Sequence, residues 1–282
     1  MGRARLALPA ADCAAVTLDR RSLLARYDTQ LRQDARAEPP ARIDHDGLDG
    51  LDGGVVRWLD DAGGWEAVLW TDLREGTADA AIARQIAFFA RRGRAFEWKH
   101  HAHDQPANLP QRLVRAGLRP EPSEAVMVAS SADVPEVRLP EGLSLVGVNN
   151  PAGVDLVIAV HDEVFGADHS WLRSELLSQL AAGTAAAVLA MAGDRPVGSA
   201  RMQFHPGTDF ASLWGGATLP AWRGRGLYRA MVTHRARLAA ARGHSYVQVD
   251  ALPTSQPILQ RLGFTELTTT TPYVWTPQRP EH

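Results

Sequence analysis

The stretch Thr218-Leu-Pro-Ala-Trp-Arg-Gly-Arg-Gly-Leu-Tyr-Arg229 decides the fold of this 282-residue chain. A strand-like segment leads into it, and a helical pattern over 227–242 follows. The first N–H groups of such a helix lack partners and point into the loop, where the helix dipole favours negative charge. In Arg223-Gly-Arg-Gly226 the glycines permit close approach to a phosphate and the arginines add positive charge. The loop therefore predicts an anion site for a pyrophosphate, with an ordinary turn and solvated arginines as the alternative.

The surrounding pattern predicts a mixed, mainly antiparallel sheet flanked by helices, an α+β fold. Hydrophobic periodicity and turn residues define the expected elements. The expected strands are 143–146, 186–192, 197–204, 212–218 and 246–250, the expected helices are 151–165, 171–182, 227–242 and 254–262, and a strand pair that includes Thr268 to Thr271 closes the chain.

The first half of the chain repeats the outline of the second. Both halves contain a helical run that ends in glycine, a strand, a second Leu-Gly helix end and a final strand. The matching positions are Gly93 and Gly243, Asp104 and Asp250, Gly117 and Gly263, and the segments 125–128 and 273–275. We interpret this as a duplicated domain, with a first copy over 1–130, a proline-containing linker over 131–141 and a second copy over 142–282.

Composition excludes several classes of protein. The chain has 30 Lys+Arg and 32 Asp+Glu, so it lacks the basic excess of a general nucleic-acid binder. Its single cysteine, Cys13, cannot form an intramolecular disulfide, which favours a reducing compartment. No stretch reaches the about 18 to 20 apolar residues of a membrane helix, and the N-terminus lacks the apolar run of a signal peptide. We expect a cytoplasmic protein without nucleic-acid or membrane partners.

Two motifs resemble the GNAT (Gcn5-related N-acetyltransferase) superfamily. Arg223-Gly-Arg-Gly-Leu-Tyr228 is similar to the signature Q/R-x-x-G-x-G/A at Arg223 and Gly226. Pro257-Ile-Leu-Gln-Arg-Leu-Gly-Phe264 resembles the family's helix that ends in L-Y-x-x-L-G-F. Both occur in the family's order and spacing, and they cover most of 142–276. The resemblance implies tandem GNAT-like domains, of which the first is degenerate.

The same resemblance implies a cofactor and a reaction. Acetyl-CoA would lie in a cleft where the fourth and fifth strands separate, and an amine would attack its thioester. The acceptor would be an amine of a small molecule or peptide, and acetyl is the family's common acyl group. The cofactor-binding residues implied are Thr218, Leu219, Arg223, Gly224, Arg225, Gly226, Leu227, Tyr228 and Ser255.

The sequence departs from the family at the catalytic positions. Leu259 stands where a tyrosine usually protonates the thiolate, and Tyr228 stands where Gly or Ala is usual. Tyr273 and Tyr228 are the candidate replacements for the acid. Strand 212–218 lacks the glutamate that many relatives use as base, and Asp250, otherwise a turn or helix-start residue, is the nearest candidate.

The run from His161 to Trp171 lies where family members line the acceptor pocket. Its aromatic and charged residues suit recognition of a small amine, although Phe165 and Trp171 could equally be core. The substrate-binding residues we assign are Phe165, Asp168, His169 and Trp171. His100-His-Ala-His-Asp104 suggests a metal, but a further ligand is not apparent. We expect solvated histidines near the domain interface and no metal.

The first half lacks the anion loop. Gly76 in Leu73-Arg-Glu-Gly76 matches Gly226, but the Arg-Gly pair is missing and Glu75 would repel a phosphate. This half could cover the acceptor side, complete a sheet or form a homodimer surface. Two other functions remain open: a catalytically idle acyl-CoA-binding or interaction module, and an aminoacyl or peptidyl transferase on a duplicated version of the fold.

Overall fold

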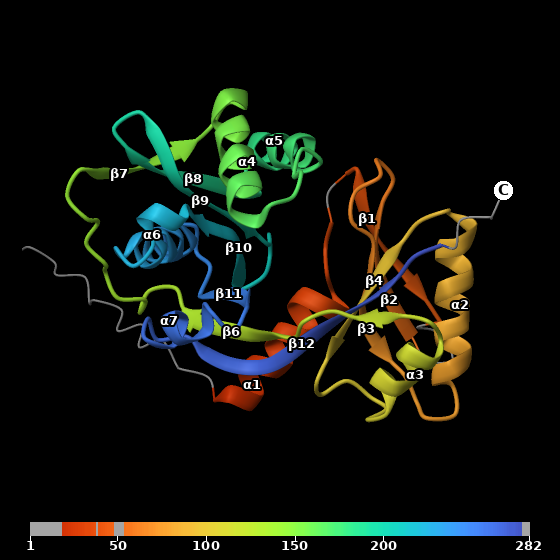
Figure 1. Ribbon diagram of the computed structural model, residues 1–282. Helices are drawn as coiled ribbons and strands as arrows, with labels where there is room; N and C mark the ends of the chain where they lie inside the picture. The colour runs from red at the N-terminus through yellow and green to blue at the C-terminus, as the bar shows by residue number, and fades with distance from the viewer. Residues whose placement is uncertain (1–18, 38, 48–53, 278–282) are drawn as a thin grey trace, which may run out of the picture.

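The computed structural model describes residues 19–37, 39–47 and 54–277 as two lobes joined by one sheet (Figure 1). The strand order is β1-β2-β3-β4-β12-β6-β11-β10-β9-β8-β7, with β5 also paired to β12. Most neighbours are antiparallel, and the mixed α+β architecture expected from the sequence is confirmed. Cys13 and the N-terminal residues lie outside the described ranges.

The first lobe is built around an amphipathic helix. Ala78, Ile82 and Phe89 lie on one face of α2 and pack into a core that also contains Trp98. The elements of this part of the chain are α1 (Arg20–Tyr27), the π-helical turn η1 (Asp28–Gln33), β1 (Ala41–Asp46), β2 (Gly54–Asp60), β3 (Ala67–Asp72), α2 (Ala78–Arg91), β4 (Phe96–His101), α3 (Leu109–Arg115), β5 (Arg119–Pro120) and β6 (Glu124–Ser130).

The second lobe follows the pattern expected from the sequence. Helix α4 begins after the Asn150 cap and ends at Gly166, whose φ of +68° suits glycine. Its bounds, and those of α6 to within one residue, are as predicted. The elements are β7 (Leu143–Val148), α4 (Pro151–Phe165), α5 (Leu172–Ala182), β8 (Ala185–Ala192), β9 (Arg195–Phe204), β10 (Phe210–Thr218), the 3-10 turn η2 (Pro220–Trp222), α6 (Leu227–Ala241), β11 (Tyr246–Ala251), α7 (Gln256–Gln260) and β12 (Thr265–Trp275).

The last element among the described residues is one long strand, so the expected closing strand pair is wrong. Residues Thr265–Thr270 of β12 pair with β6, and Thr270–Trp275 pair with β4 of the first lobe. Strand β6, from the first half of the chain, pairs with β11 of the second lobe. Each half therefore gives its last strand to the other lobe, and the lobes in space do not coincide with the halves of the sequence (Figure 1).

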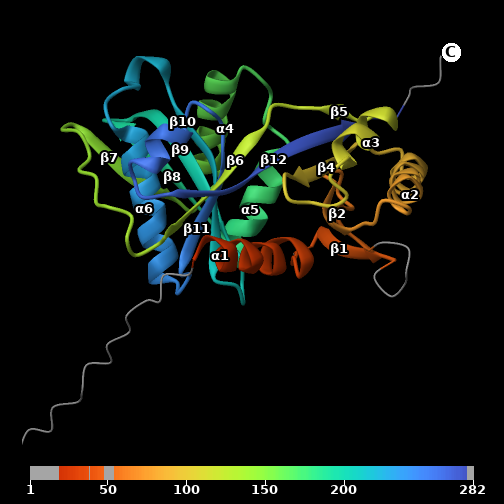
Figure 2. The ribbon, with the colours of Figure 1, turned by 90° about the horizontal axis from the view of Figure 1, so that it is seen from below.

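Helices cover both faces of the sheet in the second lobe. Helices α4 and α5 pack on alternate residues of β8, such as Ala187 and Leu189. Helix α6 packs on the residues between them, Val188 and Ala190, and therefore on the opposite face. Helix α1 runs along β12 where the lobes meet (Figure 2). Within the described residues, helices fall short of the length and apolarity that crossing a membrane requires.

Candidate active site

Strands β10 and β11 separate after a short parallel contact. Only Phe210–Ser212 pair with Tyr246–Gln248, although the strands continue to Thr218 and Ala251. A bulge in β10 between Trp214 and Ala217 bends this strand further. The separation opens toward the loop that precedes α6, as expected for the cofactor cleft.

The loop before α6 presents a row of free backbone donors. Gly224 and Gly226 have φ values of +75° and +88°, which other residues rarely adopt. Among the described residues, nothing accepts a hydrogen bond from the N–H groups of residues 224–228. A β-carbon added at Gly224 would meet no atom within 4 Å, so this side of the loop is open. These features fit a pyrophosphate.

Other groups expected at the cofactor already have partners in the chain. The exposed side chain of Arg223 donates from Nε to the carbonyl of Thr218 at 3.1 Å. The N–H of Leu219 donates to Val197 O on β9, away from the separation. Arg225 lies 4.8 Å over the ring of Trp222. A ligand that uses the Thr218 carbonyl would have to displace Arg223.

The ring of Tyr228 packs against the β10 bulge. Its Cε2 is 2.8 Å from where a β-carbon would stand on Gly216 of β10, so only glycine fits there. The ring packs on the core cluster that contains Leu259. Burial raises the pKa of the Tyr228 hydroxyl, with Arg235 and the side chain of Ser255 opposing the shift, and the hydroxyl is protonated at neutral pH. Tyr228 thus brings a proton donor to Ser255, which precedes the helix that carries Leu259.

Asp250 connects the two lobes. Its Oδ2 is bound to Nζ of Lys99 from β4, and its Oδ1 accepts from Gln248 Nε2 at 2.7 Å. Burial is the largest influence on the pKa of Lys99 and lowers it, but the charge and hydrogen bond of Asp250, together with the charges of Tyr27 and Glu97, outweigh burial and raise the pKa. Both carboxylate oxygens therefore already accept hydrogen bonds, and the role of Asp250 as base stays a prediction.

The structure does not bring Tyr273 to this site. Tyr273 pairs with Trp98 and lies with it in the core of the first lobe, 7% exposed. Lys99, the next residue of β4, points to the opposite face and binds Asp250. Because the two predicted catalytic side chains lie on opposite faces of the sheet, Tyr273 is a core residue and not the expected proton donor.

The predicted acceptor residues divide into two groups. The rings of Phe165, His169 and His161 form a cluster with centroids 5.4 to 5.9 Å apart. His161 reaches the β10 bulge, where its Nε2 donates to Gly215 O at 2.8 Å. Burial lowers the pKa of His161, which keeps the ring neutral.

The remaining two predicted acceptor residues point elsewhere. Asp168 accepts from the N–H of Ser170 in its own turn. Trp171 is half-exposed. Phe165 of the first group is half-exposed too, so neither ring is a core residue. Among the acceptor candidates, His161 is therefore the one that contacts the strand separation, and its spacing of four residues from Phe165 on one helix face is the sequence signal for it.

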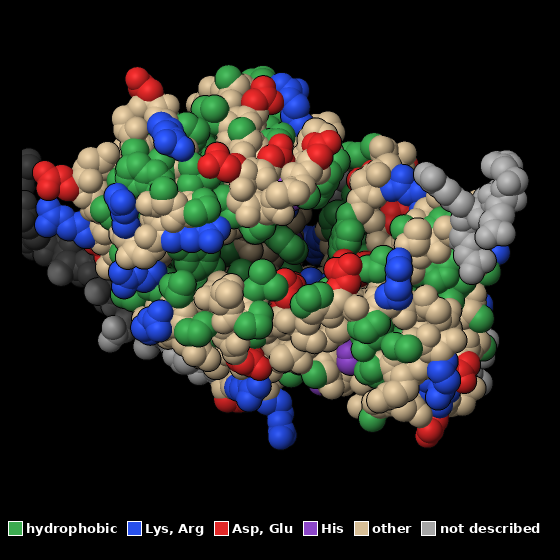
Figure 3. Space-filling model, in the orientation of Figure 1, with side chains coloured by type: hydrophobic (Ala, Val, Ile, Leu, Met, Phe, Trp, Pro, Cys, Tyr) green, Lys and Arg blue, Asp and Glu red, His purple; other side chains and the backbone are tan. Residues whose placement is uncertain are grey.

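A hollow lies between the lobes beside this site (Figure 3). The ring of Trp214 stands 5.7 Å from Cζ of Arg201 and 5.8 Å from Nζ of Lys99. Burial raises the pKa values of Glu97 and Glu124, and the charge of Asp250 adds to the shift. Local sequence patterns do not identify Lys99 or Glu97, because these residues reach the site from the other half of the chain.

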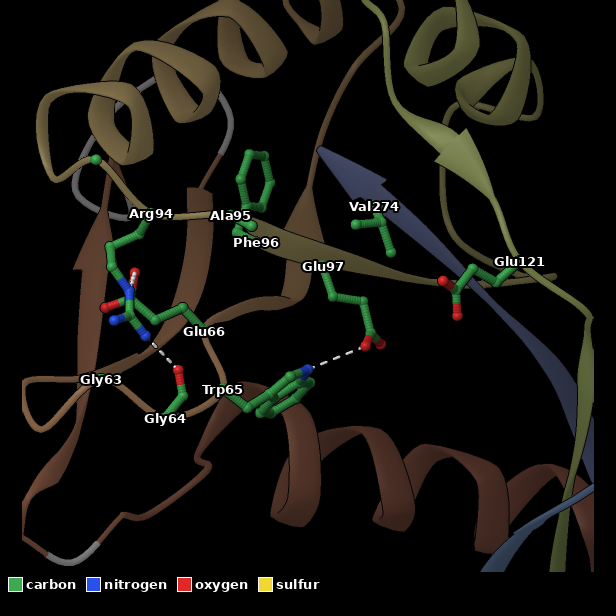
Figure 4. A pocket seen from close by; sticks show the side chains of 11 residues that line it. Gly63, Gly64, Trp65, Glu66, Arg94, Ala95, Phe96, Glu97, Glu121 and Val274 are labelled. Atoms are coloured by element: carbon green, nitrogen blue, oxygen red, sulfur yellow. Dashed lines mark hydrogen bonds and ion pairs between the residues drawn. The ribbon is translucent and has the colours of Figure 1, made fainter. Parts of the chain in front are cut away.

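The first lobe has a pocket of its own, about 530 Å³ in volume. Trp65 and Glu97 point toward one another on its wall, and Trp65 Nε1 donates to Glu97 at 3.0 Å (Figure 4). Glu121 and Val274 also line it. Glu97 shares a face of β4 with Lys99, so this pocket borders the face that carries Asp250.

The histidine run is not solvated as expected. His100 and His101 are buried, and Asp104 is bound to Arg32. His103 binds Asp28 at 2.8 Å. Across the described ranges, no three His, Cys, Asp or Glu side chains converge in a way that could hold a metal ion.

Comparison with known proteins agrees with this geometry. Residues 155–264 match the model of the acetyltransferase (GNAT) family, so this segment is a GNAT domain. The match contains both the strand separation and the anion loop. The resemblance to GNAT proteins inferred from the sequence is thereby confirmed. No curated protein matches the chain in sequence.

Solved structures share the fold over both lobes. A GCN5-related N-acetyltransferase from Kribbella flavida is 17% identical, with a TM-score of 0.66 over 95% of this chain and 98% of that one. A tandem GNAT protein from the clavulanic acid biosynthesis pathway is 13% identical, with a TM-score of 0.56 over 87% and 86%. A GCN5-related N-acetyltransferase from Sphaerobacter thermophilus is 14% identical, with a TM-score of 0.57 over 82% of each chain. At these identities the similarity shows the fold, and it is consistent with a tandem arrangement.

Proposed function

We propose that the second lobe transfers an acyl group, by default acetyl, from acyl-coenzyme A to an amine of a small molecule or peptide. The observation that carries the proposal is the row of free N–H groups at residues 224–228, placed at the mouth of the β10–β11 separation. Such a row binds a pyrophosphate, and the separation leaves strand edges for an extended ligand.

The residues present fit the cofactor in part. Bound acyl-coenzyme A would supply an activated thioester. The N–H groups of residues 224–228 would hold its pyrophosphate, and Arg223 and Arg225 would add positive charge. Tyr228 keeps its proton at neutral pH and could give it to a departing thiolate. The acceptor would enter from the hollow between the lobes, beside Trp214 and the Lys99–Asp250 pair.

Calorimetric titration with coenzyme A tests the binding step. We expect one site per chain, because the matching loop of the first lobe carries the negative charge of Glu75 and has no Arg-Gly pair. A folded chain that does not bind coenzyme A would remove the proposal, and two sites per chain would show that the first lobe also binds.

Thiol release from acetyl-CoA with a panel of amines tests the transfer step. The competing function is an idle acyl-CoA-binding module, favoured by the buried Leu259 at the usual position of the acid. Binding without amine-dependent thiol release, across primary amines and peptides, would favour the idle module.

A further inference from the structure

Two buried donors at the β10 bulge have no acceptor. Arg201 Nε and Trp214 Nε1 are both shielded from solvent, and neither hydrogen-bonds to any described residue. The two residues are register partners on β9 and β10, so their side chains lie on the same face of the sheet. Leaving such groups unpaired is costly, so two of them side by side indicate a ligand with acceptor atoms.

Apart from its contact with the ring of Trp214, the guanidinium of Arg201 has no hydrogen-bond or ion-pair partner among the described residues. Its Nε lies 3.5 Å from where a β-carbon would stand on Gly215, so the group sits directly on the bulge. No carboxylate of the described residues lies within ion-pair distance, and Glu175 acts on Arg201 only through its field. The terminal amino groups have no described partner and are not among the fully buried orphan atoms, so they remain available to a ligand.

A second guanidinium approaches the backbone of the bulge from the opposite face of the sheet, where α6 packs. Arg235 is 2% exposed and donates to the carbonyls of Met231, Arg201 and Trp214, the latter two at 2.9 and 3.2 Å. Burial lowers the pKa of Arg235 to about 10, so it is still charged at neutral pH. Lys99 is neutralised by Asp250, whereas Arg201 and Arg235 have no acidic partner among the described residues. An anion at the bulge would contact Arg201 directly, and the charge of Arg235 would stabilise it from across the sheet.

We propose that the β10 bulge binds a carboxylate through Arg201 and the indole N–H of Trp214. A planar guanidinium fork matches the two oxygens of a carboxylate, and the indole adds a third donor. Because the bulge adjoins the strand separation, the carboxylate belongs to one of the two reactants: the acyl group of a dicarboxylic acyl donor, or a carboxylate-bearing amine acceptor. This assignment of its source rests on the proposed acyl transfer, but the site itself does not.

A titration of the isotope-labelled protein with succinate tests the site without coenzyme A. Arg Nε–H and Trp Nε1–H groups give their own signals in ¹H–¹⁵N spectra, and the variants Arg201→Gln and Trp214→Phe identify the two signals. We expect both signals to shift with succinate and not with neutral succinamide. Unshifted signals, or equal shifts with succinamide, would overturn the proposal whether or not the chain binds coenzyme A.

The second experiment finds which reactant carries the carboxylate. Initial rates are compared for succinyl-CoA against acetyl-CoA, and for L-lysine against the diamine that lacks its carboxylate. We expect Arg201→Gln to raise KM about tenfold to a hundredfold for the carboxylate-bearing member of one pair only. Trp214→Phe should have the same selectivity with a smaller effect.

The matched control is Arg195→Gln, which removes an exposed arginine from the same strand. This variant should leave KM unchanged for all four reactants. A loss that is equal for carboxylate-bearing and carboxylate-free reactants would mean that Arg201 supports the fold rather than a ligand. That result would overturn the assignment to a reactant.

Discussion

Two pairs of parallel strands separate in this molecule, one in each lobe, with different results. In the first lobe β3 and β4 pair only at Ala67–Val68 and Glu97–Trp98, as β10 and β11 do in the second. There the opening is filled: Arg32 donates from Nε to Leu69 O at 3.1 Å and from Nη2 to both oxygens of Asp104, which accepts from the N–H of His101. One buried ion pair thus satisfies both strand edges.

The two helices that follow these openings, α2 and α6, also differ in how many of their first N–H groups have an acceptor. At the start of α2, Arg74 N–H donates to Thr77 Oγ1, and Ala78 N–H donates to Arg74 O. Glu75 beside it binds Asn108. The N–H groups of residues 75, 76, 79 and 80 have no described acceptor, so α2 keeps some free donors beside Glu75. At the start of α6 the whole consecutive run 224–228 has no described acceptor, and arginines flank it. The same separation of two parallel strands therefore has two outcomes. Where side chains such as Arg32 and Asp104 bind the backbone groups of the separated strands, it becomes part of the core, and where no side chain does so, it remains a candidate site.

The largest expected effect comes from removing the ion pair that closes the first lobe. Arg32→Met should lower the free energy of unfolding by about 3–5 kcal/mol, because it leaves the buried carboxylate of Asp104 without a countercharge and also removes the ion pair with Asp28. Urea unfolding measures this loss. Adding Asp104→Asn to the variant should restore much of it, since an amide oxygen can still accept from the N–H of His101.

The control is the exposed pair Arg26–Asp209, whose side chains are 42% and 32% exposed. Arg26→Met should cost less than about 1 kcal/mol. If Arg32→Met lowers the free energy of unfolding no more than Arg26→Met does, the buried ion pair does not stabilise the filled opening of the first lobe. The contrast between the two lobes would then have no energetic basis.

The second prediction concerns the acid that replaces the family's tyrosine. Tyr228→Phe should lower kcat by about 10²-fold with little change in coenzyme A affinity, because it removes only the hydroxyl beside the strand separation. The matched control is Tyr273→Phe, which removes a hydroxyl from the core of the first lobe and should leave kcat unchanged. Steady-state kinetics with acetyl-CoA distinguish them, and equal rates for both variants would exclude Tyr228 as the acid.

The sequence predicted the second lobe well because its signals are local. The Asn150 cap, Pro151 and Gly166 bound α4, and the alternation of glycine and arginine at 223–226 marks the loop that the structure leaves open. Such signals depend on residues close in sequence, so they do not require knowledge of the fold.

The exchange of strands between the lobes could not be read from the sequence. Strand β12 has the threonine-rich pattern of any edge or hairpin strand, and nothing in it states that Thr270–Trp275 pair with β4. Because of this exchange of strands, Lys99 contacts Asp250, and Tyr273 lies in the core of the first lobe. Each depends on contacts more than 150 residues apart in the chain, such as the Lys99–Asp250 pair at a separation of 151.

A third, smaller effect is expected at the anion loop. Arg223→Gln and Arg225→Gln should together weaken coenzyme A binding about tenfold, because two charges near the pyrophosphate are lost while the N–H row remains. Calorimetry measures the change, and Arg138→Gln, at an exposed position of the connection between β6 and β7, is the control. Unchanged affinity would place the pyrophosphate elsewhere. Gly226→Val is a poor test here, since its φ of +88° would strain the folded chain.

The smallest effect concerns pH and the closed opening of the first lobe. His101 lies there, with its Nδ1 donating to Lys99 O and its Nε2 accepting from Tyr27, so the ring is neutral. Burial lowers its pKa well below the ordinary value, and the charges of Arg32 and Lys99 add to the shift. An unfolded His101 binds a proton near its ordinary pKa whereas the folded one does not. Stability from this residue is therefore present above the ordinary pKa and is lost as the pH falls below it.

The expected loss from His101 is about 0.7 kcal/mol as the pH falls from about 7 to about 6. Urea unfolding at the two pH values measures it, and His101→Gln should reduce the pH dependence by that amount. His45→Gln, at an exposed position of β1, should leave it unchanged. If the free energy of unfolding of His101→Gln changed with pH as much as that of the unmodified protein, His101 would take up a proton in the folded state. The neutral hydrogen-bonding scheme that joins α1 to β4 would then be wrong.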